Sequence, residues 1–99
     1  MRRRAKARVR TLLGGFSSRV GSETLNVRIY RDREAFVCER ELVERDGTSF
    51  TMVLPFRDAE AARELLEADP YYPQVRLEVG RALGALHKAL SEEHGDRAG

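Results

Sequence analysis

Alternating apolar and polar residues, and the turns that separate the alternating stretches, constrain the fold of this chain more than any other feature. Residues 25–30 alternate from Leu25 with the two-residue period of a half-buried strand. Two further extended stretches cover residues 36–44 and 49–56, and Asp46-Gly47 marks the turn between them. The pattern predicts three sequential antiparallel strands, a β-meander.

The length of the last turn sets the register of the strands. A two-residue loop at Asp46-Gly47 would place Glu39 and Glu41 on the apolar face of the sheet. A three-residue loop of residues 45–47, with Gly47 at positive φ, keeps these carboxylates off that face and lets the three strands share one apolar side. The pairs in this register are Leu42–Phe50, Cys38–Leu54 and Phe36–Phe56, and, across the first turn, Arg31–Phe36, Ile29–Cys38 and Leu25–Leu42.

Two helices are predicted after the strands. The first begins at Asp58, a good N-cap residue, and ends before Pro70. The second begins at Pro73 and runs to about His94, with Gly95 as its stop. We therefore predict an α+β fold in which the two C-terminal helices pack on one face of the meander. Their apolar positions are Ala62, Leu65 and Leu66 in the first helix and Val75, Val79, Ala82, Leu83, Leu86 and Leu90 in the second.

The N-terminal segment has two interpretations. Residues 5–13 form either a helix that Gly14 closes or a strand that turns at Gly14-Gly15. We favour the strand, in an N-terminal hairpin with residues 16–20 that extends the same sheet. The pairs in this hairpin would be Val9–Val20 and Leu13–Phe16.

Charge is divided unevenly along the chain. Residues 1–22 hold seven basic residues and no acidic one, a charge of +7. Residues 23–99 hold the other 11 basic and all 16 acidic residues, a charge of −5, so the two parts sum to the +2 of the whole chain. We divide the chain accordingly into a basic N-terminal arm, residues 1–22, and a single α+β domain, residues 23–99. The basic residues of the arm are Arg2, Arg3, Arg4, Lys6, Arg8, Arg10 and Arg19.

The basic arm favours an acidic partner, and DNA or RNA is the first candidate. Clustered arginines neutralise phosphates and release counterions, which gives affinity for nucleic acid of any sequence. A solvated tail, or an arm that folds back onto the acidic body, explains the same charge. The arm lacks aromatic residues interleaved with its arginines, so base stacking would have to come from the sheet. Our leading hypothesis is a small non-enzymatic protein that self-associates and binds nucleic acid through this arm.

A second surface is predicted on the C-terminal helix and the linker before it. Gly80 and Gly84 each cost about 1 kcal/mol in a helix interior relative to alanine. Close approach of another backbone would offset this cost, either inside the fold or in a homodimer, and Leu77 extends the same side. In the linker, Tyr71 and Tyr72 lie between prolines, as aromatic residues at interfaces often do. The alternative hypothesis is a protein-interaction or regulatory module that uses these residues and has no role with nucleic acid.

Residue types that carry catalysis or bind metals are few and poorly placed. Cys38 falls on the predicted buried side, where a thiol behaves as a small hydrophobe. His87 and His94 are seven residues apart, about two helical turns, which is too far to ligate one metal ion. We therefore expect no catalytic residue, no metal site and no cofactor.

Arg40 is the one charged residue that the register places on the apolar face, opposite Met52. A buried guanidinium needs a partner, and Glu64 or Glu67 of the first helix is the expected one. A third hypothesis, a ligand binder or small enzyme with an anion site at Arg40, predicts a concave pocket on the helix-covered side of the sheet.

The sequence also bears on location. No apolar run approaches the roughly 20 residues that cross a bilayer, so we expect no membrane association. The start of the chain lacks the apolar core of a secretory signal, because Leu12-Leu13 runs directly into Gly14-Gly15. Cys38 is the only cysteine, which excludes an intrachain disulfide and suits a reducing compartment. We expect a cytoplasmic protein.

Overall fold

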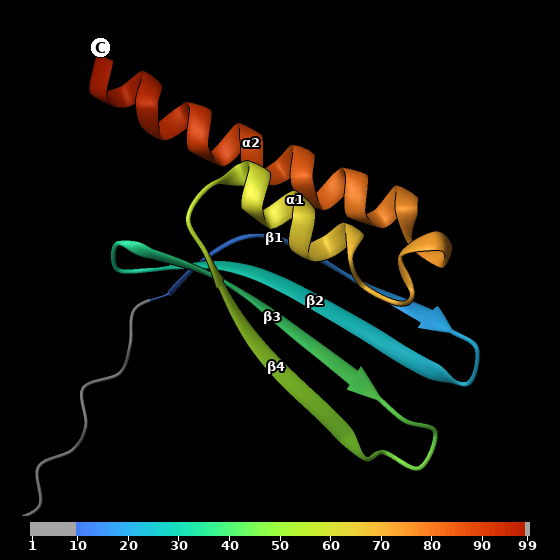
Figure 1. Ribbon diagram of the computed structural model, residues 1–99. Coiled ribbons are helices and arrows are strands. Elements are labelled where there is room, and N and C mark those ends of the chain that lie inside the picture. Colours follow the sequence, from blue (N-terminus) through green and yellow to red (C-terminus); the bar gives the residue numbers. More distant parts are fainter. Residues whose placement is uncertain (1–9, 99) are drawn as a thin grey trace, which may run out of the picture.

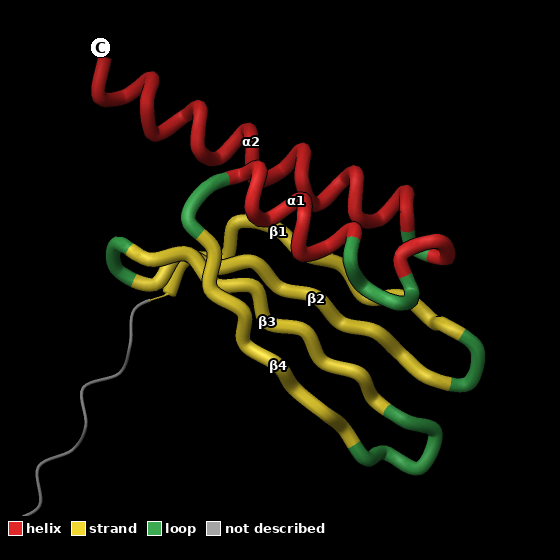
Figure 2. The backbone as a smooth tube through the Cα atoms, viewed as in Figure 1, coloured by secondary structure: helices red, strands yellow, loops and turns green. Residues whose placement is uncertain are grey.

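The protein folds into one sheet with two helices on one of its faces. The computed structural model describes the backbone of residues 10–98 and the side chains of residues 10–92. The sheet is antiparallel, with strand order β1-β2-β3-β4, and the helices lie together on one side of it (Figure 1, Figure 2). The α+β fold predicted from the sequence is confirmed. Its elements are β1 (Arg10–Val20), β2 (Glu23–Asp32), β3 (Ala35–Val43), β4 (Ser49–Phe56), α1 (Ala59–Glu67), the 3₁₀ turn η1 (Tyr72–Gln74) and α2 (Arg76–Ala98).

The predicted register of β2, β3 and β4 is confirmed. The loop of residues 45–47 is closed by Glu44, whose N–H donates to the carbonyl of Thr48 at 2.7 Å, and Gly47 has a φ of 93°. This three-residue turn keeps the apolar side chains of all three strands on the face under the helices. The pairs found are Arg31–Phe36, Ile29–Cys38, Leu25–Leu42, Phe36–Phe56, Cys38–Leu54 and Leu42–Phe50.

A strand before β2 is also confirmed, but its predicted turn at Gly14-Gly15 is wrong. β1 runs through both glycines and pairs with β2, with a bulge between Leu12 and Gly14. Both glycines allow close packing. A Cβ on Gly15 would lie 2.4 Å from the carbonyl oxygen of Val27, and one on Gly14 would lie 3.1 Å from that of Ala82 in α2.

The predicted hairpin pairs therefore do not form among the described residues. Phe16 pairs with Val27 instead of Leu13, and Val9, predicted opposite Val20, lies outside the described residues. The boundary predicted between residues 22 and 23 falls in the tight turn between β1 and β2. The second half of the predicted arm is thus part of the sheet.

The helices confirm one predicted start and correct the other. Asp58 caps α1, because its Oδ1 accepts a hydrogen bond from the N–H of Ala61 at 2.8 Å. Pro73 lies in η1, and α2 begins three residues after it, since residues 71–75 form the tighter i to i+3 hydrogen bonds of a 3₁₀ turn. The predicted stop at Gly95 is wrong, because α2 continues to Ala98. A glycine that ends a helix commonly does so with a left-handed backbone, and the sequence alone does not show that conformation.

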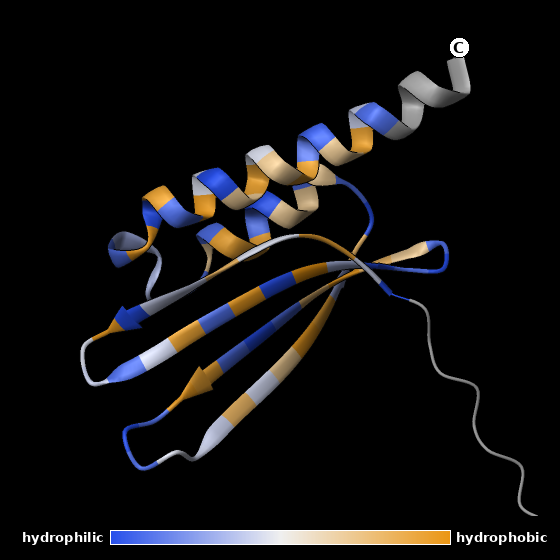
Figure 3. Cartoon of the chain, turned by 180° about the vertical axis from the view of Figure 1, so that it is seen from behind, coloured by the Kyte–Doolittle hydropathy of each residue, from blue (hydrophilic) through white to orange (hydrophobic). Residues whose placement is uncertain are grey.

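The helices cover the two halves of the sheet unequally. α2 packs on β1, and the strand residues Leu25, Val27 and Ile29 of β2 are almost fully buried. On the same face of β4, Phe50 is 56% exposed and Met52 is 49% exposed. Figure 3 shows the contrast in composition, since β4 lacks the deep blue of the charged residues in β2 and β3. The apolar face of the sheet is therefore partly bare along β4.

Candidate interaction surface

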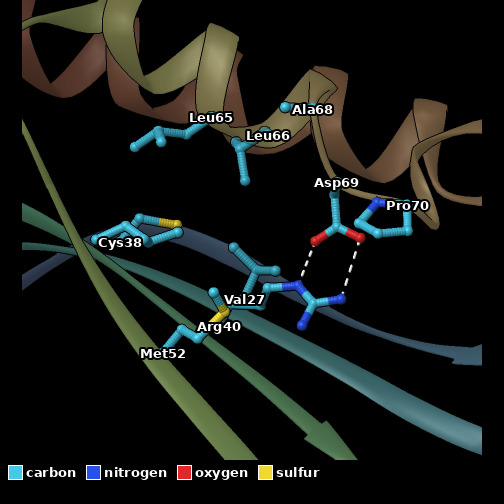
Figure 4. Close-up of a pocket in the computed structure, with 10 residues that line it drawn as sticks. Val27, Cys38, Arg40, Met52, Leu65, Leu66, Ala68, Asp69 and Pro70 are labelled. Carbon is cyan, nitrogen blue, oxygen red and sulfur yellow. Dashed lines mark hydrogen bonds and ion pairs between the residues drawn. The ribbon is translucent and has the colours of Figure 1, made fainter.

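A hollow of about 320 Å³ lies between α1 and the bare part of the sheet. Cys38 and Arg40 of β3 and Met52 of β4 form its floor, and Leu65 belongs to the wall contributed by α1 (Figure 4). Leu54 of β4 also lines the hollow. Most of this lining is apolar, and it includes the exposed side chain of Met52. The concave site predicted on the helix-covered side is therefore present. The remaining lining residues are Val27, Leu66, Ala68, Asp69 and Pro70.

Arg40 is held at one end of this hollow by an internal ion pair. Its Nε and Nη2 donate to the two carboxylate oxygens of Asp69, the second at 3.2 Å (Figure 4). The prediction of an internal carboxylate partner is confirmed, but the predicted residues, Glu64 and Glu67, are wrong. Asp69 follows α1 in a turn where its Oδ1 also accepts from the N–H of Tyr71 at 2.9 Å, so the carboxylate is fixed in place.

This pairing changes what the hollow can bind. The hydrogen bonds that Arg40 donates to Asp69 raise the pKa of Arg40 above its ordinary value, so the guanidinium stays charged and its charge is matched by the carboxylate. A matched pair offers little net attraction to a free anion. The geometry thus supports a hollow for an apolar group in preference to the anion site considered from the sequence.

Cys38 contributes apolar surface to the floor of the hollow. Its side chain is 2% exposed, and burial raises its pKa to about 11. A thiol with that pKa is protonated at neutral pH and is a poor nucleophile. Burial of this residue, predicted from the strand pattern, is confirmed.

β4 is an edge strand with an unusual composition for such a position. Residues 47–56 are the longest stretch of the sequence without a charged residue. Phe50 and Met52 project on the helix side, and Val53, 51% exposed, projects on the opposite side. Edge strands usually carry charges or other features that block pairing with a second chain. The uncharged stretch could be seen in the sequence. Whether the side chains of β4 are exposed depends on how far the helices extend over the sheet.

A row of carboxylates lies on the face of α1 next to the one that lines the hollow, outside the lining itself. Glu60, Glu64 and Glu67 are exposed and share one face of the helix, at spacings of four and three residues. By helical periodicity, the face that carries Leu65 and Ala68 lies between this row and the buried face of α1. The wall of the hollow therefore has an acidic rim toward solvent.

The sequence-predicted basic residues are not brought together in the described part of the protein. Arg10 lies 3.6 Å from carboxylates of Asp32 and of Glu39, and its guanidinium lies over the ring of Tyr30 at 4.9 Å. Arg19 is exposed near the other end of β1. The other five, Arg2, Arg3, Arg4, Lys6 and Arg8, lie outside the described residues.

The face of the sheet away from the helices carries a network of paired charges. Arg28 donates to Glu39 at 3.0 Å and to Glu41 at 3.3 Å, and Asn26 donates to Glu41 at 3.1 Å. Hydrogen bonds from Asn26 and Arg28 lower the pKa of Glu41. With Arg10 of β1, which lies 3.6 Å from Glu39, the network joins three strands, and its positive and negative charges are matched.

The predicted interface on α2 is exposed, and Leu77 lines an open hollow at the start of the helix together with Tyr72 and Glu78. Leu77 is 73% exposed, and a Cβ on Gly80 or Gly84 would meet nothing within 4 Å. Packing inside the fold therefore does not explain the two glycines. In the linker, the hydroxyl of Tyr71 donates to Glu23 at 2.6 Å, and the rings of Tyr71 and Tyr72 pack against the core.

Among the residues with described side chains, no group of three or more histidine, cysteine, aspartate or glutamate residues is placed to hold a metal ion. His87 is exposed, and the side chain of His94 lies outside the described residues. None of the described helices is both long enough and apolar enough to cross a membrane. Comparison with known proteins gives no match: no family model, no curated protein and no solved structure is significantly similar to the chain.

Proposed function

We propose that the protein is a non-enzymatic binding module that holds a polypeptide partner in the hollow beside β4. The observation that carries the proposal is an apolar hollow of about 320 Å³ that opens onto an uncharged edge strand with exposed Phe50 and Met52. Continuous exposed apolar surface of this kind commonly marks a site of protein interaction. The hollow has room for a large apolar side chain of the partner.

The acidic rim favours a partner with basic residues. A peptide that places an apolar side chain in the hollow would bring its flanking residues near Glu60, Glu64 and Glu67. Basic flanking residues gain from these carboxylates and acidic ones are repelled. The proposed partner is therefore an extended segment in which a large apolar residue stands beside lysine or arginine.

Selection from a phage-displayed library of random 12-residue peptides on the full-length protein tests this function. Selected peptides, synthesised and labelled, should share the apolar-basic pattern in fluorescence anisotropy measurements. Leu65→Lys places a charge in the wall of the hollow and should weaken their binding at least tenfold. Ser17→Lys adds the same charge on the opposite face of the sheet, where Ser17 is exposed, and should leave binding unchanged.

Glu64→Gln should lower the affinity for the selected peptides by a few-fold. The effect should be larger at low salt, because ions screen surface charge pairs. Peptides that bind Leu65→Lys as tightly as the unaltered protein would place the binding surface elsewhere and contradict the proposal.

A second candidate function, nucleic-acid binding by the basic arm, rests on the charge of +7 in residues 1–22 and on the exposure of Arg19. Its test is the affinity for a generic duplex and a generic single strand at several salt concentrations. Replacing the five basic residues among residues 2–8 with glutamine should then lower affinity and reduce the salt slope by up to roughly 3.5 for the single strand and 4.5 for the duplex. Unchanged affinity in that variant would remove this candidate.

The cytoplasm suits the proposed function. The single cysteine of the chain is a buried thiol, so the fold is compatible with a reducing compartment.

A further inference from the structure

The free edge of β4 carries a regular set of main-chain hydrogen-bonding groups. The pair that closes the β3–β4 loop is hydrogen bonded, because Glu44 donates to Thr48 and Gly47 donates to Glu44. Hydrogen-bonded and non-hydrogen-bonded pairs alternate along an antiparallel ladder. Phe50, Met52 and Leu54 therefore bond to β3, and the main-chain groups of the residues between them point away from it. The outward-pointing residues are Ser49, Thr51, Val53 and Pro55.

Pro55 is consistent with this assignment. Proline has no N–H, so in a sheet it is tolerated where the missing donor would face solvent at an edge. The free edge of β4 thus presents three N–H groups, from Ser49, Thr51 and Val53, and ends at a proline. The opposite edge of the sheet, β1, is interrupted by a bulge and bears Arg10 and Arg19. Of the two described edges, that of β4 has the longer uncharged stretch and no bulge.

We infer that β4 pairs antiparallel with β4 of a second copy of this chain, with Thr51 opposite Thr51, to form a continuous eight-stranded sheet. In this register Ser49 of each protomer faces Val53 of the other, and all three outward N–H groups of each strand meet a carbonyl. Pro55 falls just beyond the paired stretch. Sliding the register by one pair toward Pro55 places this residue opposite Ser49 and leaves the Ser49 carbonyl without a donor.

The side chains are self-complementary in the same register. Phe50 of one protomer lies opposite Met52 of its partner on the helix side, a sulfur–aromatic combination that is favourable. Thr51 faces its own copy on the other side, and threonine pairs across strands are also favourable. β4 itself has no charge to repel its copy.

The predicted dimer is weak, because little surface becomes buried. Phe50, Met52 and Val53 are each about half exposed, so covering their free surface removes on the order of 250 Å² per protomer from water. That is well below the roughly 800 Å² per partner of stable complexes. We therefore expect self-association that is detectable only at high protein concentration. The twofold axis is perpendicular to the sheet, so both hollows lie on the same face of the dimer.

Sedimentation velocity of the full chain from about 10 μM to 1 mM tests the inference. The sedimentation coefficient should rise from a monomer value toward that of a dimer. Thr51→Pro removes the central outward donor and should remain monomeric at every concentration, since Pro55 shows that this side of β4 accepts proline. Thr51→Val keeps the N–H and should dimerise like the unaltered protein. A monomer at 1 mM, or a Thr51→Pro variant that still dimerises, would overturn the proposal.

Amide hydrogen exchange of the unaltered protein gives an independent answer if Thr51→Pro does not fold. Exchange at Ser49, Thr51 and Val53 should slow several-fold between 10 μM and 1 mM, while exchange along β1 stays constant. Equal rates at both concentrations for these three amides would also overturn the inference. Neither measurement depends on the peptide partner proposed for the hollow.

Discussion

At the scale of single residues, glycines of this protein have opposite roles that depend on their surroundings. Gly15 lies where β1 approaches β2, and a Cβ there would meet a backbone carbonyl at 2.4 Å. Backbone cannot move aside as a flexible side chain can. Gly80 is exposed on α2 with open space around its missing Cβ, so it only lowers the stability of the helix. Glycine is therefore required at the first position and dispensable at the second.

Alanine substitutions at these two glycines should change stability in opposite directions. Gly15→Ala forces a shift of the β1–β2 pairing and should lower the free energy of unfolding by about 2 kcal/mol or more. Gly80→Ala should raise it by about 0.5 to 1 kcal/mol. Urea denaturation followed by circular dichroism measures both. A Gly15→Ala variant as stable as the unaltered protein would show that the sheet is not packed as described.

At the scale of elements, two arginines in neighbouring strands have different environments. Arg40 lies under the helix layer, with 16% of its side chain exposed, and pairs with Asp69, which is 8% exposed. Arg28 lies on the opposite face with 36% exposed, and it pairs with two glutamates near solvent. Removing one member of a shielded pair leaves the other charge unmatched, whereas an exposed pair contributes little. The first pair ties the turn after α1 to the sheet.

Replacing each of the two arginines with methionine should lower the free energy of unfolding by different amounts. Arg40→Met leaves the carboxylate of Asp69 without its partner and should lower the free energy of unfolding by about 2 kcal/mol or more. Arg28→Met should cost less than about 1 kcal/mol. Both values come from urea titrations at neutral pH. Equal losses would mean that the pair at the hollow is as solvated as the surface network.

At the scale of the whole molecule, local sequence patterns predicted the strands. Which of their side chains remain exposed depends on long-range packing. The register of β2, β3 and β4 followed from the turn at Gly47 and the need to keep carboxylates off the apolar face. The course of β1 could not be predicted, because only contact with Val27 and with α2 explains two adjacent glycines in a strand. The partner of Arg40 was missed for a similar reason, since the turn after α1 places Asp69 where the helix carboxylates do not reach.

The candidate surface depends on the extent of the helix layer, which no local pattern specifies. The uncharged sequence of residues 47–56 is visible in the chain, and a covered strand in a protein core would have the same composition. Only the arrangement of α1 and α2 over the sheet shows that Phe50 and Met52 remain exposed. The contrast between this bare strip and the covered part of the same face is the basis of the proposed function.

Chemical-shift mapping by nuclear magnetic resonance tests that claim most directly. The ¹⁵N-labelled full chain is titrated with a peptide selected from the random library, and the affected amides are assigned. The largest shifts should fall on Met52, Leu54 and Leu65, around the hollow. Shifts confined to α2 near Leu77, Gly80 and Gly84, or to β1 and the residues before it, would contradict the claim.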